Sequence, residues 1–135
     1  AVGKDHPIKG TLSLDDYLRY PHAVAHFGLD TRTVEEADIE RQGIAIRDHL
    51  LIPGFSGLFY QLNGTQLIAT VQRRLAALLA PSAGVRILEP PVKLPILRET
   101  LIWHRRNDDD PGHQWLRKLL IDTAEKLKED TAQRA

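Results

Sequence analysis

The six histidines are the residues that a metal site in this chain would use first. Only His22 and His26 lie close together, at a spacing that would pair them on a helix, but the Ala- and Val-rich run around them predicts a strand. Zinc sites need a third ligand at a recognisable spacing, and the sequence has neither Cys nor an H-E-x-x-H motif. We therefore interpret the histidines as structural or solvated and predict no metal site.

An acidic run near Asn107 resembles the start of a calcium loop. Asn107, Asp109 and Gly112 fit the first, third and sixth positions of an EF-hand-like loop. Pro111 then occupies the fifth position, and Lys118 stands where the bidentate acid is required. Asp residues followed by Pro are instead typical of a helix N-terminus, so we expect a helix to begin here.

The sequence offers no catalytic machinery. The run from Gly54 to Gly57 contains Ser56 between glycines but is one residue too short for a G-x-S-x-G nucleophile elbow. A G-x-G-x-x-G loop for a dinucleotide is absent as well. We predict a protein that is not an enzyme, with no catalytic residue and no cofactor.

The composition is that of an ordinary globular domain, 42% hydrophobic and 27% charged over 135 residues. Acidic and basic residues balance at 18 each, so the chain has no global attraction for nucleic acid, and DNA contact would need another domain. The sequence lacks Met, Cys, a signal peptide and any apolar stretch of roughly 18 residues. We expect a cytoplasmic fragment of a longer protein.

Short apolar runs alternate with amphipathic segments, which predicts a mostly parallel sheet covered by helices. Helix N-caps are expected at Ser13, with Asp16 three residues later, and at Thr33, which forms a capping box with Glu36. Pro81 is expected to stop a later helix, and Pro111 to open a long last one. The expected strands are residues 22–27, 44–52, 66–71, 85–88 and 94–104.

Two stretches follow predicted parallel strands directly: Pro53 to Ser56 and Thr70 to Arg73. Open α/β sheets bind ligands at the carboxyl ends of their strands, so we expect a ligand site there. Backbone N–H groups at the two helix starts, with Arg73 and Arg74, would suit a carboxylate or another anion. The alternative is that both arginines only cover the helix surface.

The same segments resemble LysR-type transcriptional regulators, in the branch of nodulation and aromatic-degradation regulators, from His6 to about Leu120. The resemblance rests on the order and spacing of short motifs rather than on any one of them. These motifs are His6-Pro7, Leu14-Asp15-Asp16-Tyr17-Leu18, Pro21-His22, Ile52-Pro53-Gly54-Phe55, Leu67-Ile68-Ala69-Thr70-Val71, Arg73-Arg74-Leu75-Ala76, Lys93-Leu94-Pro95, Trp103-His104 and Asp110-Pro111-Gly112-His113-Gln114-Trp115-Leu116-Arg117.

The resemblance implies an α/β fold like the type 2 periplasmic binding proteins, with two lobes and an effector in the cleft between them. Residues 1–89 would form the second lobe, 90–95 the crossover or hinge, and 96–135 a strand and helix belonging to the first lobe. The DNA-binding domain would lie outside this chain, and the sheet would be truncated on its N-terminal side. Carried over by position, the effector-binding candidates are Pro53, Gly54, Phe55, Ser56, Thr70, Lys93 and Pro95.

The resemblance also implies a function: sensing a small effector, an aromatic or carboxylate compound, that modulates DNA binding in a dimer or tetramer. Two positions depart from the branch, since Gly54 often has a polar or bulky counterpart and Gln72 commonly a Pro. Phe55 reads equally well as a core aromatic on its helix. The alternatives are a lobe of a solute-binding protein, which would carry a secretion signal, and a small flavodoxin-like enzyme, which would show a phosphate loop.

Overall fold

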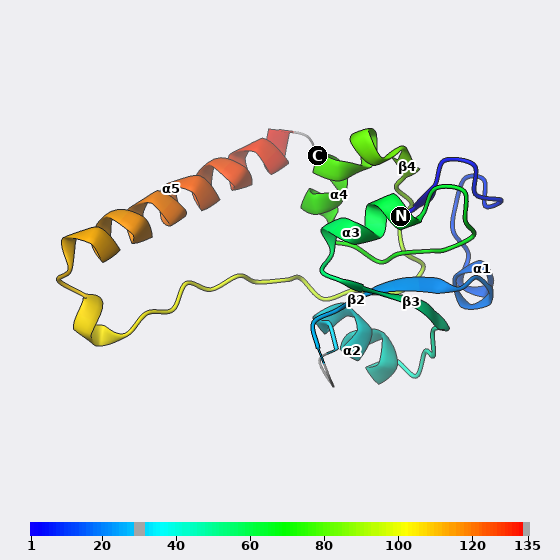
Figure 1. Cartoon of the computed structure of the whole chain (residues 1–135), viewed down its shortest axis with the longest axis horizontal. Helices are drawn as coiled ribbons and strands as arrows, with labels where there is room; N and C mark the ends of the chain where they lie inside the picture. Colours follow the sequence, from blue (N-terminus) through cyan, green and yellow to red (C-terminus); the bar gives the residue numbers. More distant parts are fainter. Residues whose placement is uncertain (29–31, 134–135) are drawn as a thin grey trace. The chain divides into compact units, whose positions relative to one another are not determined.

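The structure is a computed structural model, and it describes residues 1–28 and 32–133, with side chains up to residue 128 (Figure 1). The chain forms two compact units, Ala1–Ile96 and Leu97–Ala135. Assignment of these units to the two lobes of a binding protein stays a prediction.

A parallel pair of strands lies at the centre of the first unit. Strand β2 (His22–His26) pairs with β3 (Asp48–Pro53), so that Ala23 lies opposite Leu50 and His26 opposite Pro53 (Figure 1). β2 is where it was predicted. β3 begins at Asp48 rather than at residue 44, because residues 44–47 form a loop that leads from the preceding helix.

Residues 66–71, predicted as a strand, lie beside β2 but form only isolated bridges instead of a regular strand. Ile68 makes isolated bridges to His22, in parallel, and to Val2, antiparallel. The amide of Ala23 donates to the carbonyl of Ile68 at 2.9 Å, and the amide of Ala69 donates to the carbonyl of Ala1 at 3.0 Å. The segment thus lies between two neighbours, although its pairing with each is too short for a continuous ladder.

The predicted strand at residues 85–88 is shorter and points the other way. Strand β4 (Val85–Arg86) pairs with β1 (Val2–Gly3) in antiparallel register. The Arg86 guanidinium holds the N-terminal segment further, because its Nη2 donates to the carbonyls of His6 and Ile8 at 3.1 and 2.7 Å. The sheet regions are therefore mixed rather than purely parallel.

Both predicted N-caps are present. Ser13 caps α1 (Leu14–Arg19) by accepting from the amide of Asp16 at 3.1 Å. Thr33 caps α2 (Val34–Arg41), and the Glu36 carboxylate accepts from the Thr33 amide at 2.8 Å, which completes the capping box. These caps fix where the two helices begin because they satisfy amides that have no partner inside the helix.

The two remaining helices of this unit are α3 (Ser56–Gln61) and α4 (Arg73–Ala83). The expectation that Pro81 stops α4 is wrong, since α4 continues through Pro81 and ends at Gly84, whose φ of 63° is left-handed. Proline lacks one amide donor but the turn around it still closes, and glycine allows the left-handed C-terminal cap. The side-chain amide of Asn63 caps the Ala83 carbonyl.

The core of the first unit lies between the sheet and its helices. Tyr17, Ile39 and Ile68 anchor one cluster, and Leu58 and Leu62 anchor another against β2. Each of these side chains is almost completely buried. This packing supplies a rigid base for the ends of β2 and β3.

The second unit contains a 3₁₀ turn, η1 (Arg105–Asn107), and the long helix α5 (Pro111–Gln133). Asp110 caps α5, since its carboxylate accepts from the His113 amide at 2.8 Å, so the helix prediction for the acidic run is confirmed. The predicted strand at 94–104 is wrong: the segment pairs with no other described residue, and a strand requires a neighbour to satisfy its backbone.

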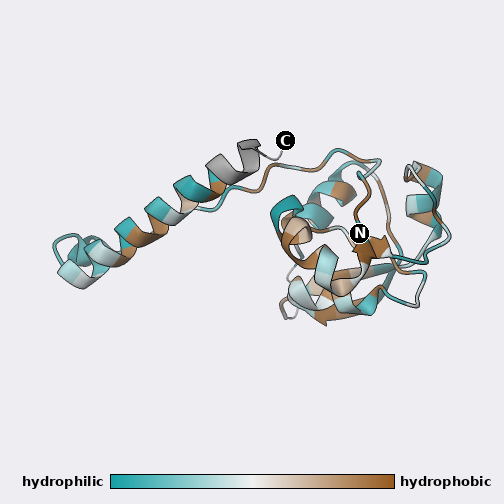
Figure 2. Ribbon diagram, turned by 90° about the horizontal axis from the view of Figure 1, so that it is seen from above, coloured by the Kyte–Doolittle hydropathy of each residue, from teal (hydrophilic) through white to brown (hydrophobic). Residues whose placement is uncertain are grey.

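The helix α5 carries its apolar stripe on the surface of this unit (Figure 2). The Arg117 guanidinium lies 4.8 Å from the centre of the Trp103 ring, and Trp103 donates its indole N–H to Asp108 at 2.8 Å. Arg117 also donates to the Asp108 carbonyl at 2.8 Å. The motif residues of this region therefore fasten the start of α5 to the segment before it. Among the described helices, none is long and apolar enough to cross a membrane.

Candidate effector site

Four of the predicted site residues form the turn between β3 and α3. Pro53 ends the strand, Gly54 turns the chain at a φ of 84°, and Ser56 opens the helix. Nothing lies within 4 Å of a Cβ built on Gly54, so its requirement for glycine comes from the backbone conformation alone. Pro53 and Ser56 are exposed, while Gly54 and Phe55 are half-buried.

Phe55 pairs with an aromatic residue that the sequence argument missed. The Phe27 ring, which follows the carboxyl end of β2, lies 5.5 Å from the Phe55 ring, centre to centre, at a tilt of 54°. Phe27 is 54% exposed. Two neighbouring aromatic rings, one of them largely open to solvent, form an apolar platform at the ends of both parallel strands.

The Thr70 hydroxyl forms a hydrogen bond with a buried tyrosine. The Thr70 and Tyr17 hydroxyls form a hydrogen bond of 2.7 Å, and Tyr17 is almost completely buried beneath it. Burial raises the pKa of the Tyr17 phenol, which stays protonated and able to donate. The orientation of the Thr70 hydroxyl is therefore fixed by a helix that is remote in sequence.

His22 is buried next to the same tyrosine. Its Nε2 lies 2.7 Å from the Tyr17 carbonyl, which can only accept, so Nε2 carries the proton. The two rings meet edge to face, with centres 4.6 Å apart. Burial lowers the pKa of His22, and the neutral imidazole is the form that this environment favours.

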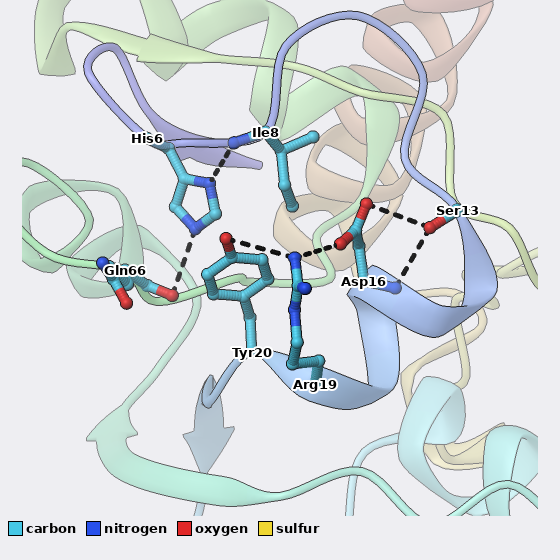
Figure 3. A network of polar contacts seen from close by, with 7 residues as sticks. All are labelled: His6, Ile8, Ser13, Asp16, Arg19, Tyr20 and Gln66. Atoms are coloured by element: carbon cyan, nitrogen blue, oxygen red, sulfur yellow. Dashed lines mark hydrogen bonds and ion pairs between the residues drawn. The ribbon is translucent and has the colours of Figure 1, made fainter.

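His6 is a second buried histidine with a structural role (Figure 3). Its Nδ1 accepts from the Ile8 amide at 3.2 Å and its Nε2 faces the Gln66 carbonyl at 3.1 Å. No cluster of three or more potential metal ligands occurs among the described residues. The structural interpretation of His6 and His22 follows from the carbonyls that hold them.

Phe55 and Thr70 meet at one small cavity. Its volume is about 10 Å³, roughly the space for one water molecule. The helix α2 supplies one wall through Thr33, Glu35 and Glu36. The remaining lining residues are Ile39, which is also on α2, His22, Val24 and Ala25 of β2, Ile46 of the loop before β3, Phe55 and Thr70.

A hydrogen bond between two helix starts lies beside this cavity. The side-chain amide of Gln72, the N-cap residue of α4, donates to the Glu35 carboxylate in the first turn of α2 at 3.0 Å. Arg73 is engaged elsewhere, since its guanidinium lies 3.0 Å from the Glu89 carboxylate. Neither Arg73 nor Arg74 lines the cavity, which favours the alternative that they cover the helix surface.

Lys93 and Pro95 do not line this cavity. The Lys93 carbonyl accepts from the Gln42 side chain at 2.7 Å, just beyond the C-terminus of α2, and the neighbouring Val92 is buried. The structure thus brings together Phe55 and Thr70 among the predicted residues, while Lys93 lies on a segment tied to the far end of α2. A role for Lys93 and Pro95 as a hinge stays a prediction.

The chain is similar to known bacterial regulators over most of its length. It is 31% identical over 121 residues to nodulation protein D 3 of Rhizobium leguminosarum bv. phaseoli, covering 89% of this chain and 40% of that protein. It is 36% identical over 121 residues to the transcriptional activator NagR of Ralstonia sp, covering 88% of this chain and 40% of NagR. No protein-family model matches.

Solved structures of bacterial transcriptional regulators also match this chain. The regulatory domain of MexT, a transcriptional activator in Pseudomonas aeruginosa, is 33% identical with a TM-score of 0.64, over 82% of this chain and 56% of that chain. A Vibrio parahaemolyticus protein described as a transcriptional regulator shares the fold, with a TM-score of 0.79 at 24% identity over 95% of this chain and 60% of that chain.

The fold and its relatives define a regulatory domain of the type 2 periplasmic-binding-protein-like class, as predicted. The chain belongs to the LysR-type transcriptional regulators. It spans 40% of the length of the curated relatives described above.

Proposed function

We propose that this chain is the effector-sensing part of a LysR-type transcriptional regulator, and that its effector binds at the carboxyl ends of β2 and β3. The sensing step is binding and conformational change, with no covalent chemistry. The regulator acts in the cytoplasm as a dimer or tetramer, and its DNA contacts lie in a winged helix-turn-helix domain outside this chain.

The observation that carries the proposal is the meeting of Phe55 and Thr70 at one cavity. Phe55 follows β3, which pairs with β2 in parallel, and Thr70 follows Ile68, which bridges to β2 in parallel on its other side. Open α/β sheets bind ligands at the carboxyl ends of such segments. Phe55 contributes an apolar surface, and Thr70 a hydroxyl whose direction is set by Tyr17. The cavity has room for only about one water molecule, so the ring of an effector would lie outside it, against Phe27 and Phe55, and only its polar group would face the cavity.

The Phe27 and Phe55 rings support an aromatic effector over an aliphatic one. A planar ring can stack on or lie edge-on against this pair, and such contacts contribute about 0.5–1.5 kcal/mol beyond the area that they bury. The exposed Phe27 ring offers most of that area.

Binding would act on transcription through a change in equilibrium between two arrangements of the regulator. An effector that contacts one arrangement better shifts the population toward it by its difference in affinity. The matched proteins described above are transcriptional regulators, which favours this role over solute transport.

The test uses the full-length regulator, a labelled DNA fragment from its own promoter region and 2-naphthol as an aromatic probe. We expect the probe to change the affinity for DNA measured by fluorescence anisotropy. Phe55→Ala should abolish the response and leave probe-free DNA binding unchanged. Tyr60→Ala is the matched control, because Tyr60 is an exposed aromatic on α3, the helix that begins just after Phe55, and it does not line the cavity. A full response in Phe55→Ala would contradict the proposed site.

A further inference from the structure

The lining of the effector site is acidic and rich in hydrogen-bond acceptors. Two carboxylates from the first turn of α2, those of Glu35 and Glu36, line the cavity beside the Thr70 hydroxyl, and no Lys or Arg lines it. The nearest arginine in sequence to Thr70, Arg73, is paired with Glu89 on the surface. An effector carboxylate placed here would meet like charge.

The positive end of α2 already has a carboxylate of its own. In its capping box the Thr33 hydroxyl accepts from the Glu36 amide at 3.2 Å, and the Glu36 carboxylate accepts from the Thr33 amide at 2.8 Å. Two of the amides at this helix start are therefore matched with groups of the same segment, and the Glu36 carboxylate already lies against this end of the helix.

A carboxylate from α2 also lies next to the start of α4. Gln72 is its N-cap residue, makes no capping bond to its own helix, and donates its side-chain amide to Glu35 instead. Glu35 therefore places a negative charge from α2 next to the start of α4, where an effector carboxylate would otherwise be welcome. The hydrogen bond also shows which group Glu35 accepts readily: a neutral N–H donor.

From this cavity and the bond that joins its two helices, we propose that Glu35 determines effector specificity. It selects an aromatic effector that presents a hydrogen-bond donor, a hydroxyl or an amine, and rejects one that presents a carboxylate. The donor takes the place of the Gln72 amide on the Glu35 oxygen, while the ring lies against Phe27 and Phe55. This inference rests on the proposed function, because it concerns the same site.

The experiment compares two probes with one ring system and different polar groups, 2-naphthol and 2-naphthoate, by isothermal titration calorimetry of the full-length protein. We expect 2-naphthol to bind roughly tenfold more tightly or better, the order expected for one avoided contact between like charges. Glu35→Gln removes the charge but keeps an oxygen for the Gln72 amide, so it should reduce the preference to about threefold or less.

Glu40→Gln is the matched control on the same helix. Glu40 is exposed, pairs with Arg32 and does not line the cavity, so this variant should keep the wild-type preference. Equal or tighter binding of 2-naphthoate by the wild-type protein would overturn the role of Glu35.

Phe55→Ala separates this inference from the proposed function. If both probes lose affinity in Phe55→Ala and yet bind the wild-type protein equally, the site stands and the specificity of Glu35 is refuted. If Phe55→Ala changes neither affinity, or if neither probe binds the wild-type protein, the site itself is refuted and the inference fails with it.

Discussion

The hydrogen bond between Tyr17 and Thr70 joins the core to the effector site, and its two ends differ in exposure. The Thr70 hydroxyl belongs to a half-buried residue that water can reach, whereas the Tyr17 hydroxyl is on a side chain that is 1% exposed. Tyr17→Phe should therefore lower the free energy of unfolding by about 1 kcal/mol, the net value of one hydrogen bond. Thr70→Val should lower it by about 2 kcal/mol, because it leaves a buried hydroxyl without a partner.

The double variant distinguishes this reasoning from simple loss of packing. In Thr70→Val the buried Tyr17 hydroxyl has no partner, so removing it as well should restore part of the stability. The double variant Tyr17→Phe with Thr70→Val should therefore lower the free energy of unfolding by about 1 kcal/mol, rather than by the sum of the two single effects, about 3 kcal/mol. Urea unfolding should be followed by far-UV circular dichroism, since both tryptophans lie in the second unit and would not report on this bond. A double variant that equals the sum within about 0.5 kcal/mol would refute the reasoning.

Three further perturbations follow from particular contacts. Burial lowers the pKa of His22, so its contribution to stability is full above about pH 6.5 and is lost as the pH falls toward the folded-state pKa. His22→Gln keeps an N–H donor for the Tyr17 carbonyl and should lose less stability to urea between pH 7.5 and 5.5 than the wild-type protein. The same pH dependence in both proteins would contradict this. Gly84 has a left-handed φ of 63°, so Gly84→Ala should destabilise the chain by about 1 kcal/mol in thermal unfolding. Gly84→Asn should cost less, because Asn adopts this conformation more readily than Ala; equal losses would argue against a conformational cause. Gly3→Ala should cost about 2–3 kcal/mol in urea, since its Cβ would lie 2.4 Å from the Leu62 carbonyl oxygen, and a neutral result would show that β1 can move away.

Local signals predicted the parts of the fold that depend on neighbouring residues. Ser13 and the pair Thr33 and Glu36 cap their helices as expected, because capping is decided within four residues. The helix through Pro81 was predicted to end too early, because tertiary packing overrode one missing amide. The strand expected at 94–104 was wrong because pairing depends on a partner that sequence pattern alone does not supply.

The site was predictable only in part, for a related reason. The rule that ligands bind at strand ends led to Phe55 and Thr70, and both line the cavity. Glu35 and Gln72 were missed as a pair because they are 37 residues apart and the sequence gives no sign that the starts of α2 and α4 meet in the folded chain. Phe27 offered a signal, since it is the last residue of the strand predicted at 22–27 and so lies at the edge where a ligand was expected.

Hydrogen–deuterium exchange on the full-length protein, with and without 2-naphthol, tests most directly whether a small molecule binds where β2 and β3 end. We expect slower exchange in the two segments around Phe55 and Thr70 and at the start of α2, with little change around Gly10, on the N-terminal loop that does not line the cavity. Protection elsewhere, with these segments unchanged while the probe still alters DNA binding, would contradict binding at these strand ends.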